Sequence, residues 1–394
     1  MKKFSNPRVA WGVMALALMS LAAGAALSRW VEPGVRFESV TLAGDTPALH
    51  VFATGAGRHP VALLAHGITS SKEMLFRCAE ALAAAGFECY SVDLPGHGAS
   101  AQAFTFDRML KALGKVTPVI RPVDVFVGHS MGVYAGAAAV RDGNLNPRLF
   151  VAIGSVPDLG PHGPPLLLLA GRFEEFPGML AAMKAQTDAR VVISPWCGHA
   201  LEPWDPTLVN TAVQAACAAT GTAPPSAPTR WCWRILGIVL GFWGARGLGI
   251  CLPEIFPKLE KLRGVLLAVL IIVSSALTFP TWLAATPYLG RAPLIVAAAA
   301  ITWLMIAAAE RWRIPRWCLP ALVTGGALLC LVLGKWVSLW FSLGALLAGA
   351  FAACLWMGLL LGAIAGRGGS RRQGALAMAI FVGYVVGQWM PRFL

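Results

Sequence analysis

The stretch that decides the fold is Gly128-His129-Ser130-Met131-Gly132, which follows the apolar run Val123–Val127 and opens the helical pattern Met131–Arg141. A serine on a tight turn between a strand and a helix holds its hydroxyl clear of the sheet edge, and small flanking residues let the neighbouring backbone approach closely. Such a serine is well placed to act as a nucleophile. The pentapeptide therefore predicts a serine enzyme built on alternating strands and helices.

Short apolar runs on both sides of this motif predict further strands. Helical patterns lie between most of them, for example at 71–85, 131–141 and 206–219. This alternation indicates an α/β fold, with a mostly parallel sheet that is flanked by helices. We expect residues 30–219 to form this domain. The expected strands are 35–42, 49–53, 61–65, 88–92, 123–127, 149–153, 166–170 and 191–194.

Composition separates this domain from the rest of the chain. Of the 394 residues, 57% are hydrophobic and only 13% are charged, and the mean hydropathy is +0.65. The net charge of +13 arises outside the domain, because residues 30–229 carry 13 basic and 16 acidic groups while residues 230–394 carry 15 basic and three acidic ones. A nucleic-acid groove would place the positive charge on the folded domain, so we expect no nucleic-acid partner.

The apolar regions on either side of the domain predict membrane segments. Residues 1–29 contain an uncharged run at 9–27 behind basic residues, which is typical of either a cleaved signal peptide or an uncleaved signal anchor. Residues 220–229 form a proline-rich linker. Residues 230–394 predict an all-α bundle of about six transmembrane helices, at 234–252, 264–285, 292–309, 317–334, 339–365 and 374–390.

The distribution of basic residues orients these spans. If the chain starts outside after the linker, the expected inner loops hold nine Lys or Arg residues, and the outer loops and the tail hold three. This bias predicts an integral, multi-pass protein of a bacterial inner membrane. The domain at 30–219 would lie on its periplasmic, extracytoplasmic side.

Three further motifs make the domain resemble an α/β-hydrolase of the esterase or lysophospholipase type. His66-Gly67-Ile68 is similar to the family's His-Gly-x turn, and residues 93–100 (D-L-P-G-H-G-A-S) are similar to its D-x-x-G-H-G-x-S segment. Gly198-His199 lies near the domain's end, so the chain can supply the family's order of nucleophile, acid and histidine. The resemblance covers residues 35–220, about half of the chain.

The resemblance implies a catalytic triad. Ser130 would be the nucleophile and His199 its general base. The backbone N–H groups of Ile68 and Met131 would form the oxyanion hole. Glu174 holds the position where the family usually has an Asp in a G-x-x-D pattern. The alternatives for the acid are Glu175 and Asp158.

The expected chemistry is cleavage of carboxylic esters, of lipid-like or acyl-bearing substrates, through an acyl-enzyme intermediate. Only 12 residues separate the runs at 149–153 and 166–170, so we expect no large cap over the site. The histidines lack the spacing of zinc ligands, and we expect no metal and no cofactor. Alternatives are an acyltransferase or thioesterase, amide cleavage, and a membrane scaffold or transporter whose hydrolase-like domain only binds.

Two side-chain questions stay open at this point. Export to an oxidising compartment permits disulfides, and the options are Cys78–Cys89 and Cys197–Cys217. Large apolar residues near the expected catalytic loops either form an acyl pocket, face the bilayer or pack inside the domain. They are Phe173, Phe176, Met179, Trp196 and Trp204.

Overall fold

The computed structural model describes residues 7–256, except for 29, 56–58, 69, 121, 177 and 226–231, together with isolated positions as far as 274. The described residues form two units: residues 31–225 form one, and residues 7–30 and 232–256 belong to the other. Of the expected spans, the first lies within the described part. The span at 264–285 is described at isolated positions only, and the later ones lie outside it.

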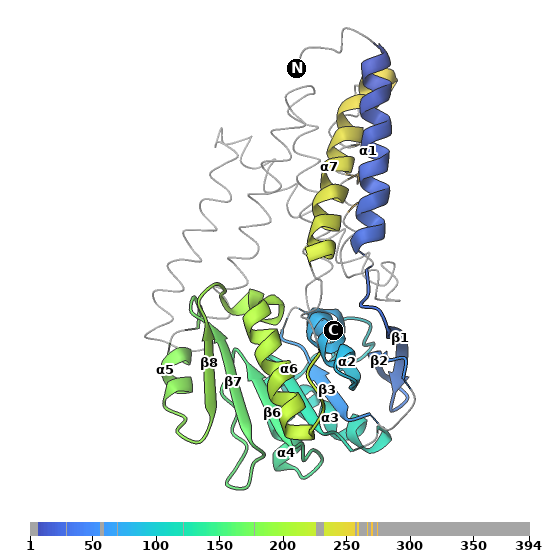
Figure 1. Cartoon of the computed structure of the whole chain (residues 1–394). Coiled ribbons are helices and arrows are strands. Elements are labelled where there is room, and N and C mark those ends of the chain that lie inside the picture. Colours follow the sequence, from blue (N-terminus) through green and yellow to red (C-terminus); the bar gives the residue numbers. More distant parts are fainter. Residues whose placement is uncertain are drawn as a thin grey trace, which may run out of the picture. The chain divides into compact units, whose positions relative to one another are not determined.

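A single eight-stranded sheet is the frame of residues 31–225 (Figure 1). Its strand order is β1-β2-β4-β3-β5-β6-β7-β8. Strand β2 is antiparallel to both of its neighbours, and β3 to β8 pair in parallel, so the sheet is mixed but mostly parallel. The strands are β1 Val35–Leu42, β2 Thr46–Ala53, β3 Val61–Ala65, β4 Glu88–Val92, β5 Val125–His129, β6 Leu149–Ile153, β7 Leu166–Gly171 and β8 Arg190–Ser194.

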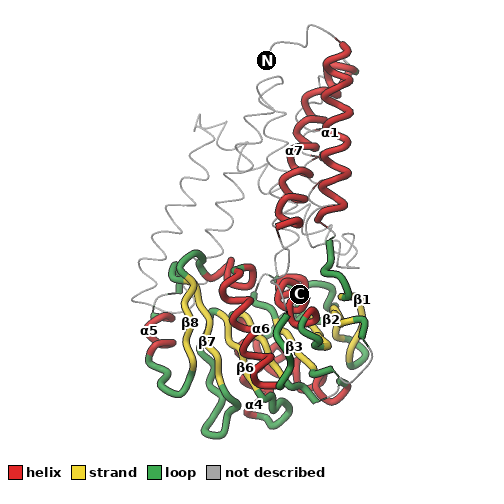
Figure 2. Tube along the Cα trace, in the orientation of Figure 1, coloured by secondary structure: helices red, strands yellow, loops and turns green. Residues whose placement is uncertain are grey.

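Helices cover both faces of the sheet (Figure 2). Every residue of β3, β5 and β6 is buried, as expected for strands with a helix layer on each side. Helices α2 (Phe76–Ala84) and α6 (Pro206–Thr220) contact each other, as do α3 (Phe106–Val116) and α4 (Met131–Arg141). Shorter helices are α5 (Met179–Lys184) and the 3₁₀ helices η1 (Lys72–Leu75), η2 (Thr117–Val119) and η3 (His199–Trp204).

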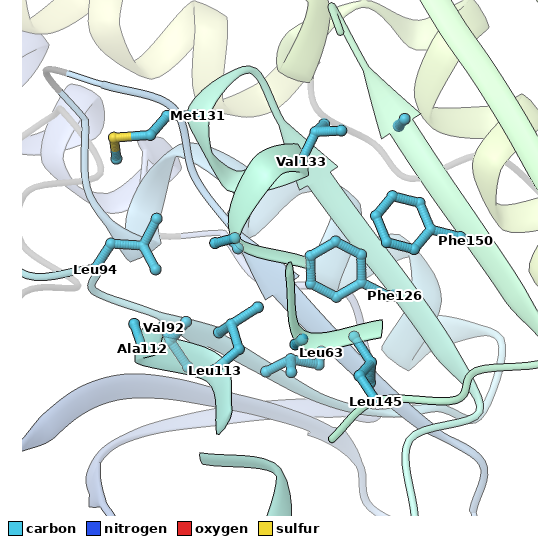
Figure 3. Close-up of a cluster of buried hydrophobic side chains, with 14 of the residues drawn as sticks. Leu63, Val92, Leu94, Ala112, Leu113, Phe126, Met131, Val133, Leu145 and Phe150 are labelled. Atoms are coloured by element: carbon cyan, nitrogen blue, oxygen red, sulfur yellow. The ribbon is translucent and has the colours of Figure 1, made fainter. Parts of the chain in front are cut away.

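Helix α4 is fixed against the sheet by the main hydrophobic core (Figure 3). The rings of Phe126 on β5 and Phe150 on β6 pack with their centroids 4.7 Å apart. A Cβ atom on Gly136 of α4 would overlap the Phe126 ring, so glycine at this position lets the helix approach β5 closely. Burying each aromatic ring contributes roughly 1.5–3 kcal/mol. This packing fixes the turn between β5 and α4, which carries Ser130.

The connection between β6 and β7 contains no helix. All of residues 154–165 are described, and they form bends, a turn and extended chain. No helical cap is therefore inserted at this point of the domain, as the sequence predicts.

The four cysteines of this unit are free thiols. Neither of the bridges weighed from the sequence, Cys78–Cys89 or Cys197–Cys217, is formed. All four side chains are buried. Burial raises the pKa of the Cys78 thiol to about 12. These thiols therefore pack as small apolar groups.

Helices α1 (Pro7–Ser28) and α7 (Cys232–Ile255) make up most of the described part of the other unit, and they pack against each other. Both are long and apolar enough to cross a membrane, judged by length and composition alone. Their backbones approach closely, because a Cβ on Gly24 would lie 2.5 Å from the nitrogen of Gly241. Arg234 is buried within α7, and its Nε donates a hydrogen bond to the carbonyl oxygen of Trp30 at 2.6 Å.

Candidate active site

Ser130 stands at the sharp turn between β5 and α4. Its backbone has φ +51° and ψ −115°, a conformation that non-glycine residues rarely adopt and that costs roughly 1–3 kcal/mol. The surrounding structure maintains this strain. The Ser130 N–H donates to the carbonyl of Ile153 at 2.9 Å, and the Val133 N–H donates to the carbonyl of Ser130 at 3.0 Å. A Cβ on Gly132 would overlap the carbonyl of Ala65, so the turn requires a glycine there.

Glu174 and His199 meet at the same edge of the sheet, although they come from different loops. Glu174 follows β7, and His199 opens η3 after β8. The Glu174 Oε2 accepts a hydrogen bond from the His199 Nδ1 at 3.0 Å, and both side chains are buried. The second carboxylate oxygen accepts the Phe176 N–H at 3.1 Å. With Nδ1 carrying the proton, the Nε2 of His199 keeps the lone pair that a base needs.

Two glycines bring the loops close to Ser130. Gly154 follows β6 with φ +67°, and a Cβ placed on it would lie 2.7 Å from the Cε1 of His199. Gly67 follows β3, and a Cβ there would lie 3.2 Å from the Cβ of Ser130. The His199 ring also lies 4.9 Å, between centroids, from the ring of His129, which precedes Ser130. The loops after β3, β6 and β8 therefore meet around the turn that carries the serine, and neither glycine has room for a side chain.

The two residues expected to form the oxyanion hole flank this convergence. Met131 is the first residue of α4, directly after Ser130. Ile68 directly follows Gly67, the residue that packs against Ser130. Both residues are therefore next in sequence to a residue of the serine turn or to one that packs against it.

The three carboxylates considered for the acid occupy distinct places. Glu174 contacts the imidazole ring, as described above. The Glu175 Oε2 accepts the backbone N–H of His199 at 2.7 Å, so it holds the loop that carries the ring. Asp158 is exposed (81% for its side chain) and lies 3.6 Å from Arg141. Of the three, Glu174 is the one whose carboxylate is hydrogen-bonded to the ring of His199 and can therefore orient it.

Glu202 is a further carboxyl group at the site, and sequence reasoning missed it. It lies in η3 and is fully buried. Its Oε1 accepts the Gly171 N–H at 2.7 Å, and its Oε2 lies 3.7 Å from both the His199 Nδ1 and the His129 Nε2. Burial, reinforced by the nearby charge of Glu174, raises the pKa of Glu202 to about 10. The available signal was its spacing of three residues from His199, which one 3₁₀ turn brings to the same side.

Other buried histidines hold the surrounding loops. The His129 Nε2 donates to the carbonyl of His199 at 3.0 Å, and burial lowers the pKa of His129 to about 3. The His66 Nδ1 donates to the carbonyl of Gly67 at 2.7 Å, while its Nε2 accepts the Leu94 N–H at 3.1 Å. Burial lowers the pKa of His66 well below its usual value. Both rings are therefore neutral parts of the frame.

One cluster has the spacing of a metal site. Ligand atoms of His129, His199 and Glu202 all lie within 4.8 Å of one another. The His129 Nε2 and the His199 Nδ1 each donate a hydrogen bond, and a protonated ring nitrogen has no lone pair for a metal. We therefore assign no metal to this cluster.

A second group of buried charges supports the loop after β3. The Lys72 Nζ lies 2.7 Å from the Asp93 Oδ2 and 3.1 Å from the Glu73 Oε1. Asp93 also accepts the backbone N–H groups of Lys72 and Ala99, each at 2.8 Å. A Cβ on Gly98, where φ is +51°, would overlap the carboxylate. The segment at 93–100 thus anchors the chain that follows Ile68.

Large apolar side chains near the site divide into two sets. Phe176 is buried with its ring centroid 4.6 Å from that of His199, and the Trp204 Nε1 donates to the Met74 sulfur, so these rings pack inside the unit. Phe173 and Trp196 are exposed, by 61% and 79%. With Leu201, which is 62% exposed, they form what we call the apolar rim.

Comparison with known proteins agrees with this geometry. Residues 58–201 match the family model Hydrolase_4, described as serine aminopeptidase, S33. The matched range includes Ser130, Glu174 and His199. No curated protein matches the chain at a significant level. The protein is a serine hydrolase, and the unit at residues 31–225 has the α/β-hydrolase fold.

Several solved structures share parts of this architecture at low identity. A dienelactone hydrolase from Anabaena variabilis is 23% identical, with 48% of this chain and 98% of that chain covered and a TM-score of 0.37. A membrane phospholipase A described as a bacterial virulence factor is 16% identical (54% and 94% covered, TM-score 0.38). The thioesterase domain from the curacin biosynthetic pathway is 15% identical (47% and 99% covered, TM-score 0.37). Likeness at this level says nothing of the substrate.

Proposed function

We propose that this serine hydrolase cleaves carboxylic esters of lipid-like or acyl-bearing substrates, with Ser130, His199 and Glu174 as its catalytic triad. The observation that carries the proposal is the buried 3.0 Å hydrogen bond from the His199 Nδ1 to Glu174, next to a serine in a strained turn. This bond sets the tautomer in which Nε2 can accept the proton of the serine.

The reaction follows from these positions. As the Ser130 Oγ attacks the ester carbonyl carbon, the His199 Nε2 takes its proton, and the N–H groups of Ile68 and Met131 stabilise the oxyanion. The C–O bond to the alcohol then breaks, and the imidazolium returns the proton to the leaving oxygen. Water, deprotonated by the same nitrogen, then attacks the acyl-enzyme, and the bond between the acyl carbon and the Ser130 Oγ breaks as the imidazolium returns the proton to that oxygen, which frees the acid and the serine.

The substrate class is supported by the surroundings of the site. No helix is inserted between β6 and β7, and the apolar rim (Phe173, Trp196 and Leu201) lies on the loops that carry Glu174 and His199. Three large exposed apolar side chains on the loops of one site fit a surface that binds an apolar partner. An acyl chain is such a partner for a serine esterase.

The membrane attachment forms part of the same proposal. Helices α1 and α7 would cross a bilayer, with α1 retained as an uncleaved anchor and residues 31–225 on the extracytoplasmic side. The close backbone contact of Gly24 with Gly241 supports retention, because removal of α1 would leave that face of α7 without its partner. Basic residues precede α1 and follow α7, which fits one cytoplasmic side for both ends.

Labelling with a fluorophosphonate probe tests the proposal. We expect the detergent-solubilised protein to be labelled, and we expect labelling to disappear in Ser130→Ala and His199→Ala. Ser39→Ala, which changes a serine on β1, is the matched control and should keep full labelling. The same preparations are then assayed with p-nitrophenyl esters of increasing acyl length. Absence of labelling and of ester cleavage in folded wild-type protein would overturn the proposal.

A second candidate function is aminopeptidase activity, which is favoured by the description of the matching family. The same triad cleaves amides when the imidazolium protonates the leaving amine. Aminoacyl p-nitroanilides, assayed beside the esters, separate the two. A preference for the anilides by kcat/KM would replace ester cleavage with peptide cleavage.

A further inference from the structure

We propose that Glu202 is a protonated positioning residue, whose neutral carboxyl group donates a hydrogen bond to Glu174 and ties the loop of the acid to the loop of the histidine. The inference deepens the proposed function and rests on the roles given there to Glu174 and His199. It assigns a task to a buried acid that the triad itself does not use.

Two carboxyl groups compete for one nitrogen of the His199 imidazole. Two carboxyl groups approach one ring nitrogen: the Glu174 Oε2 lies 3.0 Å from the His199 Nδ1, and the Glu202 Oε2 lies 3.7 Å from it. One N–H can donate fully to only one of them, and Glu174 has the shorter distance. Within the described part of the chain no N–H group donates to the Glu202 Oε2, which is shielded from solvent, and the neighbouring acceptor is the carboxylate of Glu174. A proton on this oxygen gives it a partner in Glu174.

The charges around Glu202 favour its neutral form. Within the described residues, no Lys or Arg nitrogen lies within 4.0 Å of its carboxyl group, and its basic neighbours are His199 and the neutral ring of His129. On the loop after β7, Glu174 and Glu175 both oppose a negative charge on Glu202. An isolated buried carboxylate in such surroundings takes up a proton instead of remaining charged.

The charged groups on the other elements packed against η3 are occupied elsewhere. Arg77 of α2 donates to the carbonyl of Trp204, at the far end of η3, and buried Glu80 of the same helix accepts the N–H of Glu32. Asp205 caps α6 and accepts the hydroxyl of Ser194. Lys72 and Glu73 of η1 pair with each other, and Lys72 also pairs with Asp93. None of these groups supplies the positive charge that an ionised Glu202 would need.

The remaining contact shows what the residue holds in place. The Glu202 Oε1 accepts the N–H of Gly171 at 2.7 Å, and Gly171 is the last residue of β7, just before the loop that carries Glu174. Because Glu202 is also in the same 3₁₀ helix as His199, it connects the two loops whose side chains must stay hydrogen-bonded. A shift of about 1 Å in such a pair can slow catalysis about 100-fold.

Neutrality of Glu202 also suits the chemistry. When His199 takes the proton of the serine, the imidazolium faces the single negative charge of Glu174. A second carboxylate 3.7 Å away would stabilise the imidazolium further and hinder return of the proton to the leaving group. A neutral Glu202 supplies a hydrogen bond without that charge.

Infrared difference spectroscopy on the resting protein tests the protonation without any turnover. At about pH 8 an ordinary glutamate is ionised. We expect the wild-type spectrum to contain a carbonyl stretch of a protonated carboxylic acid that disappears in Glu202→Gln and remains in the matched variant Glu175→Gln. An unchanged band in Glu202→Gln, or no band in the wild type, would overturn the inference.

Kinetics test the positioning role. Glutamine keeps both an acceptor for Gly171 and a donor for Glu174, so Glu202→Gln should keep kcat within about threefold and leave the acid limb of the kcat/KM–pH profile in place. Glu202→Leu removes both contacts and should lower kcat about 10- to 100-fold with little change in KM. A downward shift of the acid limb in Glu202→Gln would show an ionised Glu202, and full kcat in Glu202→Leu would show that it positions nothing.

The outcomes separate this inference from the proposed function. If Glu202→Leu fails to fold, judged by its thermal melt, the infrared band and the Glu202→Gln profile still decide the case. If the infrared band is missing, or is unchanged in Glu202→Gln, while the probe still labels Ser130, only the role of Glu202 is refuted. Absence of labelling in a protein that shows the band refutes the triad and leaves the protonation standing.

Discussion

Two groups of buried acidic side chains lie at the same edge of the sheet, beyond the C-terminal ends of the parallel strands. They differ in the basic side chain at their centre. In the first, Asp93 and Glu73 surround the ammonium group of Lys72. In the second, Glu174 and Glu202 surround the ring of His199, and no lysine or arginine of the described residues lies within ion-pairing distance of Glu202.

The difference shows how one fold uses buried charge in two ways. A lysine keeps its proton over the whole working range of pH, so the Lys72 group has a fixed charge and can only serve as a support. An imidazole can accept a proton in one step and release it in the next, so the His199 group can change its charge during a reaction. Perturbed acids without a fixed cation are typical of functional sites, and the second group meets that description.

The largest expected effect comes from removing the charge of the second group. Glu174→Gln replaces the carboxylate that fixes the Nδ1 proton of His199, and we expect kcat for ester hydrolysis to fall by about 10³-fold or more. The thermal melt should change little, because the amide fits the same space. A kcat within tenfold of the wild-type value would show that Glu174 is not the acid.

Breaking the first group should affect stability instead of chemistry. Lys72→Met leaves Asp93 buried without its cation, which should cost about 3–5 kcal/mol of unfolding free energy. The folded fraction should keep its kcat. Lys111→Met is the matched control, because Lys111 forms an exposed pair with Asp107 and should cost at most about 1 kcal/mol. Urea unfolding followed by circular dichroism measures the unfolding free energy of both variants. Equal losses of unfolding free energy would show that the buried Lys72 group is no more important to stability than the exposed pair.

A matched pair of glycines tests how closely the second group is packed. Gly154 and Gly143 have similar left-handed φ values of +67° and +71°, so alanine adds about 1–2 kcal/mol of backbone strain at either. A Cβ on Gly154 would overlap the Glu202 carboxyl group, whereas one on Gly143 meets nothing within 4 Å. We therefore expect kcat to fall about 100-fold in Gly154→Ala alone. Similar kcat values in the two variants would show a site that tolerates displacement.

The smallest expected effect is a pH dependence of stability. The pKa of Glu202 is raised to about 10 in the folded protein, from about 4.5 in an unfolded chain. The folded state therefore holds a proton that the unfolded state releases above that lower value, and the stability this confers is lost as the pH rises towards 10. Glu202→Gln should accordingly gain on the wild type as the pH rises, by about 1 kcal/mol or more near pH 8.

Thermal melts across the pH range check this sign. Asp107→Asn removes an exposed carboxylate and controls for the loss of one negative charge. A stability difference between Glu202→Gln and wild type that is flat or reversed with pH would mean that Glu202 is ionised in the folded protein.

The parts of the fold that could be predicted are those where local pattern and burial agree. Strands β3 and β6 are apolar runs buried on both faces, and their bounds match the prediction. At β5 the strand extends to His129, because the pairing continues into the pentapeptide itself. Strand β2 starts at Thr46, three residues before the expected start, and contains Pro47, which hides it from a pattern search.

The candidate site shows the same limit of prediction from local sequence pattern. Ser130 and His199 carry local motifs, and Glu174 is predicted as the acid from its place after a strand. Glu202 was missed because its contact with Gly171 depends on a 3₁₀ turn that contains Pro203, and no periodicity indicates such a turn. The disulfide options failed for a related reason: oxidising conditions permit a bridge, but they do not bring two particular sulfur atoms together.

The pairing of α1 with α7 has a mechanical consequence. The chain leaves α1 at Ser28 and enters α7 at Cys232, and Gly237 of α7 packs against the backbone of Leu27 and Ser28. The hydrolase unit is thus a long insertion between two paired helices. The chain connects the unit to α1 at one end and to α7 at the other. A protease that cuts only within residues 221–225 would therefore leave the unit attached through α1.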